Sequence, residues 1–116
     1  MGTILVVEDE RPVRELLAAA LEDAGHRTVQ AIDGRHALAL IAQERPDLVI
    51  ADVRMPVLGG VGLCHHLKAD PHTRAIPVVL MSAAGPQAAR GAGAEAFMDK
   101  PFDLDALEAL VRRWVA

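Results

Sequence analysis

The sequence alternates between short apolar runs and longer segments with a helical pattern, and this alternation limits the fold more than any other feature. Continuous apolar runs, typical of strands buried on both faces, lie at 3–7, 47–51 and 76–81. A shorter run at 94–98 and a more polar run at 27–31, which we expect at a sheet edge, also favour strands. Strands that alternate with helices predict a parallel sheet with helices on both faces.

Helical patterns fill most of the intervals between the strands. Apolar residues recur at helical spacing after Pro12, and Gly25 ends that pattern. Helices are predicted from Pro12 to Gly25, from Gly34 until the chain reaches Pro46, over 61–69 and onward from Asp103. Glycine and proline interrupt 83–93, which has little apolar stripe, so a helix there must be short or frayed.

Length and charge restrict the possible classes of function. A chain of 116 residues predicts one domain over 1–116, and its net charge of −4 offers no positive surface for nucleic acid or an anionic membrane. No apolar run approaches the ~20 residues of a membrane-spanning helix. The single cysteine, Cys64, excludes an internal disulfide and favours a cytoplasmic location. We expect Cys64 in the core and the histidines, His26 among them, at the surface.

Charged and hydroxyl side chains gather where the predicted strands end. They are Glu8 and Asp9 after the first strand, Asp52 after the third, Ser82 after the fourth and Lys100 after the fifth. Ligands of open parallel sheets bind outside the carboxyl ends of the strands. If the first and third strands are neighbours, three carboxylates converge, and two such charges about 4 Å apart repel by about 4 kcal/mol at an effective dielectric near 20. Oxygen ligands of this kind favour Mg²⁺ over zinc, and the whole set suits phosphoryl transfer.

The chain resembles the receiver domain of two-component response regulators, of the stand-alone, chemotaxis-regulator-like kind, from Thr3 to Val115. The motifs that carry the resemblance are Glu8-Asp9 after ILVV, Asp52 followed by Met55-Pro56, Ser82-Ala83 after VVLM, and Lys100-Pro101-Phe102. The resemblance implies an α/β, flavodoxin-like doubly wound fold. It also implies five parallel strands in the order 2-1-3-4-5, with the fourth helix shortened or irregular here.

The resemblance implies a phosphoacceptor and a magnesium site. Asp52 matches the residue that takes a phosphoryl group from the phosphohistidine of a sensor histidine kinase or phosphotransfer protein, or from a small phosphodonor. Asp9 and Asp52 match metal ligands, and Glu8 matches an acid that acts mainly through a metal-bound water. The backbone carbonyl of Arg54 matches the remaining protein ligand, so its side chain need not take part.

Further residues match the part of the family that senses the phosphoryl group. Ser82 would bond a phosphoryl oxygen and Lys100 would pair with the same group. Phe97 lies where similar domains carry a switch aromatic, which rotates when the hydroxyl of Ser82 moves inward. The Lys100-Pro101 peptide bond is cis in similar domains. Such a domain catalyses only its own phosphorylation and dephosphorylation and is not a metabolic enzyme.

The interval from Ser82 to Lys100 is about one helical turn shorter than in similar domains. A shortened helix there would leave apolar surface uncovered, so we expect an unusual homodimer as one possibility. No effector domain follows the last predicted helix, so we expect the signal to pass by protein contact from a stand-alone receiver or from a fragment of a longer protein.

Two other functions remain open from the sequence. One is a phosphorylation-independent docking or dimerisation module on the same fold, in which the acids and Lys100 form a structural ion-pair network. The other is a phosphohydrolase that forms an aspartyl phosphate. That second function is disfavoured because such enzymes place another acid two residues after the nucleophile, where this chain has Arg54.

Overall fold

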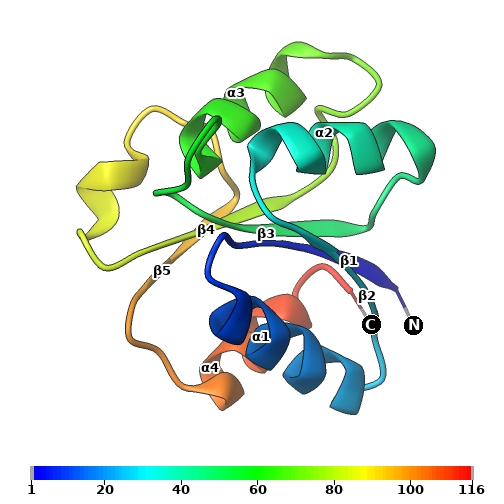
Figure 1. The fold of residues 1–116 in the computed structure, drawn as a ribbon, viewed down its shortest axis with the longest axis vertical. Coiled ribbons are helices and arrows are strands. Elements are labelled where there is room, and N and C mark those ends of the chain that lie inside the picture. Colours follow the sequence, from blue (N-terminus) through cyan, green and yellow to red (C-terminus); the bar gives the residue numbers. More distant parts are fainter. Residues whose placement is uncertain (1, 116) are drawn as a thin grey trace.

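A parallel five-stranded sheet forms the middle layer of the computed structural model, which describes residues 2–115 (Figure 1). Its strands are β1 (Thr3–Val7), β2 (Arg27–Ala31), β3 (Leu48–Asp52), β4 (Val78–Ser82) and β5 (Ala96–Asp99). They lie in the order β2-β1-β3-β4-β5, and every neighbouring pair is parallel. This confirms the predicted topology, with the polar strand β2 at an edge.

Helices cover both faces of the sheet. The helices are α1 (Arg11–Asp23), α2 (Gly34–Gln43), α3 (Gly60–Ala69) and α4 (Leu104–Val111), with a single 3₁₀ turn, η1 (Pro86–Ala89). Helices α2 and α3 lie on one face and α1 and α4 on the other (Figure 1). None of the helices in 2–115 has the length and apolar character needed to cross a membrane.

The continuous apolar runs follow from burial on both faces. Leu5 and Val7 of β1 belong to the core under α2 and α3, whereas Ile4 and Val6 belong to the core under α1 and α4. Because successive strand residues point to opposite faces, a strand with two covered faces has no polar alternation. Buried Cys64 belongs to the first of these cores, as predicted.

Three strands begin later than the sequence predicted, at 48, 78 and 96 instead of 47, 76 and 94. At β4 the reason is Pro77, which has no N–H to give to the sheet and contributes only its carbonyl, to the N–H of Val49. At the other end of these strands, Asp52 and Ser82 are the last residues of β3 and β4 and do not follow them. Their backbone is therefore fixed by the sheet itself.

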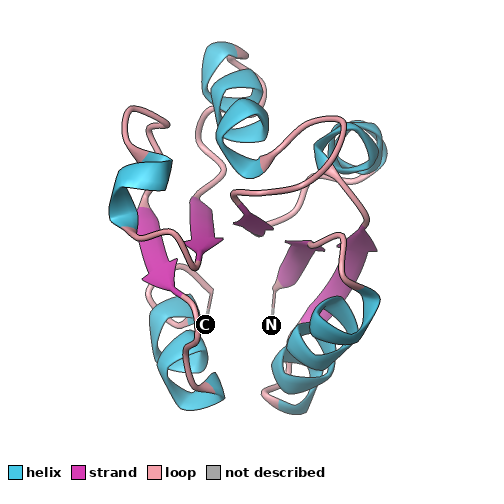
Figure 2. Cartoon of the chain, turned by 60° about the vertical axis from the view of Figure 1, so that its left-hand side comes forward, coloured by secondary structure: helices cyan, strands magenta, loops and turns pink. Residues whose placement is uncertain are grey.

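The segment 83–93 forms only the turn η1, as its glycine and proline content predicted (Figure 2). Gly85, Gly91 and Gly93 have positive φ angles, which other residues rarely adopt. The buried side chain of Ala92 packs into the core under α2 and α3. In the described part of the chain, the large apolar residues that remain exposed are Leu16, Ile32, Val57 and Leu104. Leu104 begins the last helix, where uncovered apolar surface was expected, and the homodimer stays a prediction.

Two side chains of α3 hold the shortened segment in place. The Nε2 atom of His65 lies 3.0 Å from the carbonyl oxygen of Gly91. The ammonium of Lys68 lies 2.8 Å from a carboxylate oxygen of Glu95, and Glu95 in turn accepts the N–H of Val78 at 2.7 Å. These contacts connect α3 to the chain between η1 and β5.

One histidine lies where the sequence did not predict it. His26 is buried, although it was expected at the surface. The turn through Gly25, which has a φ of 97°, folds the chain back so that the N–H of His26 reaches the carbonyl of Leu21 in α1. This turn brings the backbone of His26 to the C-terminal end of α1.

The start of α3 packs closely against the end of β3. A Cβ atom on Gly60 would overlap the carbonyl oxygen of Asp52 and would lie 2.9 Å from Leu80 Cδ2. A Cβ atom on Gly62, in the same helix, would meet only the flexible side chain of Leu58, at Cδ1 and Cγ. Only glycine at position 60 allows this approach of α3 to Asp52.

Gly60→Ala is expected to lower the free energy of unfolding by about 2 kcal/mol, because overpacking against backbone costs roughly 1–3 kcal/mol. Gly62→Ala is the matched control and should remain within about 1 kcal/mol of the wild type, since the leucine can move and alanine favours the helix. Urea unfolding, followed by the fluorescence of the single tryptophan, Trp114, measures both. Equal effects of the two substitutions would contradict the close packing described for Gly60.

Candidate functional site

Three carboxylates meet at the C-terminal edge of the sheet. Glu8 and Asp9 directly follow β1, and Asp52 ends β3, the neighbour of β1 in the sheet. One carboxylate oxygen from each of the three residues lies within 4.8 Å of the others. The convergence expected from the strand order is therefore present in the structure.

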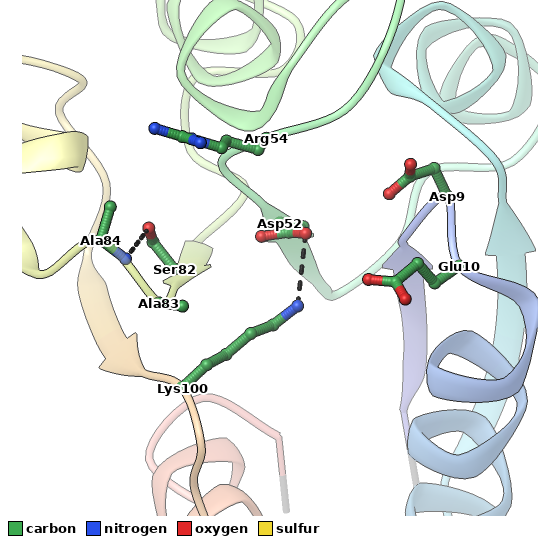
Figure 3. Close-up of a pocket in the computed structure, with 8 residues that line it drawn as sticks. All are labelled: Asp9, Glu10, Asp52, Arg54, Ser82, Ala83, Ala84 and Lys100. Atoms are coloured by element: carbon green, nitrogen blue, oxygen red, sulfur yellow. Dashed lines mark hydrogen bonds and ion pairs between the residues drawn. The ribbon is translucent and has the colours of Figure 1, made fainter.

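Lys100 reaches this cluster from the end of β5. Its Nζ atom lies 2.9 Å from Glu8 Oε1. The same atom lies 3.3 Å from Asp52 Oδ2 (Figure 3). The peptide bond between Lys100 and Pro101 is cis, as the resemblance implied. The Lys100 ammonium pairs both with the carboxylate that follows β1 and with the carboxylate that ends β3.

Ser82 stands on the other side of Asp52, at the end of β4. Its side chain is buried, and its hydroxyl oxygen accepts the N–H of Ala84 at 2.9 Å (Figure 3). Phe97, in β5, pairs with Leu80 and packs half-buried against the core under α2 and α3. The aromatic ring thus belongs to the sheet face that α3 covers.

A cavity of about 440 Å³ opens above these residues. Its lining consists of Asp9, Glu10, Asp52, Arg54, Ser82, Ala83, Ala84 and Lys100. In Figure 3 the carboxylates of Asp9 and Glu10 face Asp52 across the cavity, and the exposed Arg54 side chain extends toward Ala84. Sequence reasoning missed Glu10, although its position directly after the acid pair was a signal for it.

Burial governs the ionisation of the site. The Glu8 side chain is 0% exposed, and burial raises the pKa of its carboxyl above the ordinary value, helped by the nearby charge of Asp52 and opposed by Lys100. For Lys100, burial favours the neutral amine, but its ion pairs with Glu8 and Asp52 outweigh that effect and raise its pKa. The ammonium is therefore charged at neutral pH, whereas ionising the buried Glu8 carboxyl costs free energy.

The charge and chemistry of the cluster suit a divalent metal ion. Three carboxylates and one ammonium leave a formal charge of −2 when all are ionised. All three side-chain ligands are oxygen atoms, the type that hard cations such as Mg²⁺ prefer. A cation would also offset the cost of ionising the buried Glu8. The residues present therefore fit such an ion.

The comparison with family models identifies the chain. A model described as the response regulator receiver domain matches residues 4–112. The chain belongs to the response regulator receiver family. It is thus a signalling domain of two-component systems, as the resemblance of its motifs implied.

Individual relatives agree with this assignment. The receiver is 36% identical over 119 residues to the phosphate regulon transcriptional regulatory protein PhoB of Pseudomonas aeruginosa, an alignment that covers 96% of this chain and 52% of PhoB. The chain therefore spans about half the length of the curated relatives it matches.

Solved structures show the same fold. The signal receiver domain of a histidine kinase from Syntrophus aciditrophicus aligns with a TM-score of 0.94 and 37% identity, over 99% of this chain and 90% of that one. The receiver domain of the sensor histidine kinase PA1611 from P. aeruginosa aligns with a TM-score of 0.90 and 28% identity, over 97% and 96%. The latter is described with a magnesium ion coordinated in its active site cleft.

The raised pKa of Glu8 predicts a pH-dependent effect of Glu8→Gln on the metal-free receiver. A carboxyl whose pKa is higher in the folded chain binds its proton more tightly there, so its ionisation destabilises the fold as pH rises through the folded value. The variant should therefore match the wild type near the unfolded pKa of 4.5 and below it, and become the more stable protein toward neutral pH.

Thermal unfolding in EDTA between about pH 4 and pH 8 measures this difference in midpoint. The matched control is Glu15→Gln, because Glu15 is exposed and its pKa is lowered by Arg11, so neutralising it should destabilise the fold at neutral pH. A Glu8→Gln variant that is less stable than the wild type at every pH would show that the buried carboxylate is favourable.

Proposed function

We propose that the chain is a phosphorylatable switch that accepts a phosphoryl group on Asp52 in a magnesium-dependent reaction. The observation that carries this proposal is the position of Asp52, which is paired with Lys100 and opens into a cavity of about 440 Å³ that Ser82 also lines. The cavity leaves room beside the carboxylate for a phosphoryl group. We also propose that residues 1–116 act as one receiver domain, located in the cytoplasm.

The reaction transfers the phosphoryl group between two nucleophiles. A carboxylate oxygen of Asp52 attacks the phosphorus atom, an O–P bond forms, and the P–N bond to the donor histidine breaks, so that its electron pair returns to the imidazole. The Lys100 ammonium and the Ser82 hydroxyl contact the transferred oxygens. Glu8, Asp9, Asp52 and the Arg54 carbonyl would hold Mg²⁺, which supplies neutralisation of charge on those oxygens.

The switch begins at the Ser82 hydroxyl. Its oxygen now accepts the N–H of Ala84, and its O–H is free to donate to a phosphoryl oxygen on Asp52. A hydroxyl that moves toward that oxygen releases Ala84 and vacates space on the side where Phe97 packs. The two arrangements differ by the charge on Asp52, so phosphorylation biases one over the other.

An apolar groove beside the site suits a protein phosphodonor. It lies between α1 and the chain after β5, with a volume of about 390 Å³. Its apolar lining consists of Val13, Leu16, Leu17, Pro101, Phe102 and Leu104. Glu10, Ala83 and Lys100 line both this groove and the cavity over Asp52. A sensor kinase or phosphotransfer protein that docks here brings its phosphohistidine next to Asp52.

The output of the switch is proposed to pass through protein contact, without nucleic acid or membrane. The relatives include proteins named as transcriptional regulators, and this chain covers about half of their length. Contact of 83–93 with a partner, or with a second copy of the chain, would transmit the state of Asp52. A docking module that needs no phosphorylation is the alternative, since Lys100 already pairs with Glu8 and Asp52.

Incubation with acetyl phosphate tests the proposed function directly. Intact mass should increase by one phosphoryl group with the wild type and Mg²⁺, and should not change with EDTA or with Asp52→Asn. Asp99→Asn, which removes an exposed acid at the end of β5, is the matched control and should be modified like the wild type. A folded wild type that gains no mass and binds no Mg²⁺ would favour the docking module.

Leu16→Gln is expected to slow phosphotransfer from a kinase about tenfold, the effect of losing about 1.4 kcal/mol at an interface. Ile32→Gln is the matched control, because Leu16 and Ile32 are 57% and 52% exposed and only Leu16 lines the groove. The donor is the protein that labels the wild type fastest in a panel of autophosphorylated histidine kinases. Modification by acetyl phosphate should be unchanged in both variants; equal transfer rates would refute docking in the groove.

A further inference from the structure

A side chain outside the acidic cluster contacts the backbone that carries two of its members. Arg14, in the first turns of α1, donates from Nη1 to the carbonyl oxygen of Glu8 at 2.9 Å. Its Nε atom donates to Oε1 of Gln30, in β2, at 3.2 Å. The half-buried guanidinium therefore joins α1, the end of β1 and the neighbouring strand.

The carbonyl group that Arg14 contacts lies between the two acids. It belongs to the peptide group that links Glu8 to Asp9, and a peptide group is planar. The orientation of this peptide plane therefore influences the directions in which the Glu8 and Asp9 side chains point from the backbone. Only 8–10 separates β1 from α1, so no regular element fixes this plane.

We propose that Arg14 is a positioning residue for the metal site, which it serves by fixing the Glu8–Asp9 peptide group. The inference rests on the proposed function, because it concerns the magnesium site of the same reaction. Gln30 supports Arg14 in this role by holding the other side of the guanidinium. Among residues 2–115, the hydrogen bonds of Arg14 go to Gln30 and to the Glu8 carbonyl, and none goes to an acidic side chain of the cluster.

Charge and positioning make opposite predictions for the removal of Arg14. A positive charge near a cation site repels the cation, so its removal by Coulomb's law alone would tighten Mg²⁺ binding. Loss of a hydrogen bond that orients the ligands weakens binding instead, typically by about tenfold or more for partners just outside a metal site. The sign of the change therefore distinguishes the two roles.

The test compares Mg²⁺ affinity in Arg14→Met and Arg11→Met by isothermal titration calorimetry, without any phosphodonor. Arg11 is the matched control, since it lies one turn away on α1 and is exposed, and its one ion pair within 2–115 is with Glu15. Arg14→Met is expected to bind Mg²⁺ about tenfold more weakly than the wild type. Arg11→Met should bind as tightly as the wild type or slightly more tightly.

Two further variants separate positioning from a general loss of structure. Arg14→Lys keeps the charge and one donor and should recover part of the affinity, and Gln30→Ala should weaken binding less than Arg14→Met. With acetyl phosphate, the rate of modification of Arg14→Met should return to that of the wild type at saturating Mg²⁺. A distorted site would remain slow there, which would overturn the inference.

The remaining outcomes decide between this inference and the function on which it rests. If the wild type binds Mg²⁺ and Arg14→Met binds it equally or more tightly, the inference is wrong and the proposed function stands. If Arg14→Met does not fold, Gln30→Ala decides, and unchanged affinity in that variant refutes the inference. If the folded wild type binds no Mg²⁺, both are wrong.

Discussion

The site depends on how one ammonium group is shared between two buried carboxylates. Lys100 pairs with Glu8 at 2.9 Å and with Asp52 at 3.3 Å. Glu8 directly follows β1, and Asp52 ends β3, the neighbouring strand in the middle of the sheet. Without a positive charge, ionised carboxylates at this spacing would oppose the pairing of β1 with β3. Lys100 offsets part of that repulsion but leaves an excess of negative charge. The same imbalance that limits stability makes the cluster fit a divalent cation.

Most of the fold was predictable because the burial pattern is simple. A strand covered on both faces must be apolar throughout, so β1, β3 and β4 were evident from their sequences. The first residues of the strands could not be predicted in this way. A strand begins where its backbone hydrogen bonds to the neighbouring strand begin, and Pro77 has no N–H to donate to such a bond. The buried position of His26 was missed for a similar reason, since it depends on a turn and not on a repeating pattern.

The sequence predicted the site residues that lie at the ends of strands, but not the residues that support them. Parallel strands bring their carboxyl ends to one edge, and this placed Asp52, Ser82 and Lys100 together before any coordinates were known. Arg14 could not be found in this way. It contacts the carbonyl of a residue six positions earlier. This contact depends on the path of the loop between β1 and α1, which no periodic pattern in the sequence predicts. Such contacts need the three-dimensional structure.

The chain after Ser82 contains only the short turn η1 where a longer helix was the alternative, and this affects how a structural change at Ser82 can spread. The four residues of η1 make few backbone hydrogen bonds of their own, and three glycines with positive φ lie within the same segment. Segments of this kind open at a free energy well below that of the whole domain, so their amide hydrogens exchange early. A change at Ala84 therefore reaches a region with little cooperativity. If Asp52 is phosphorylated as proposed, the two states would differ there in local order and conformational entropy, and not in the position of a rigid helix.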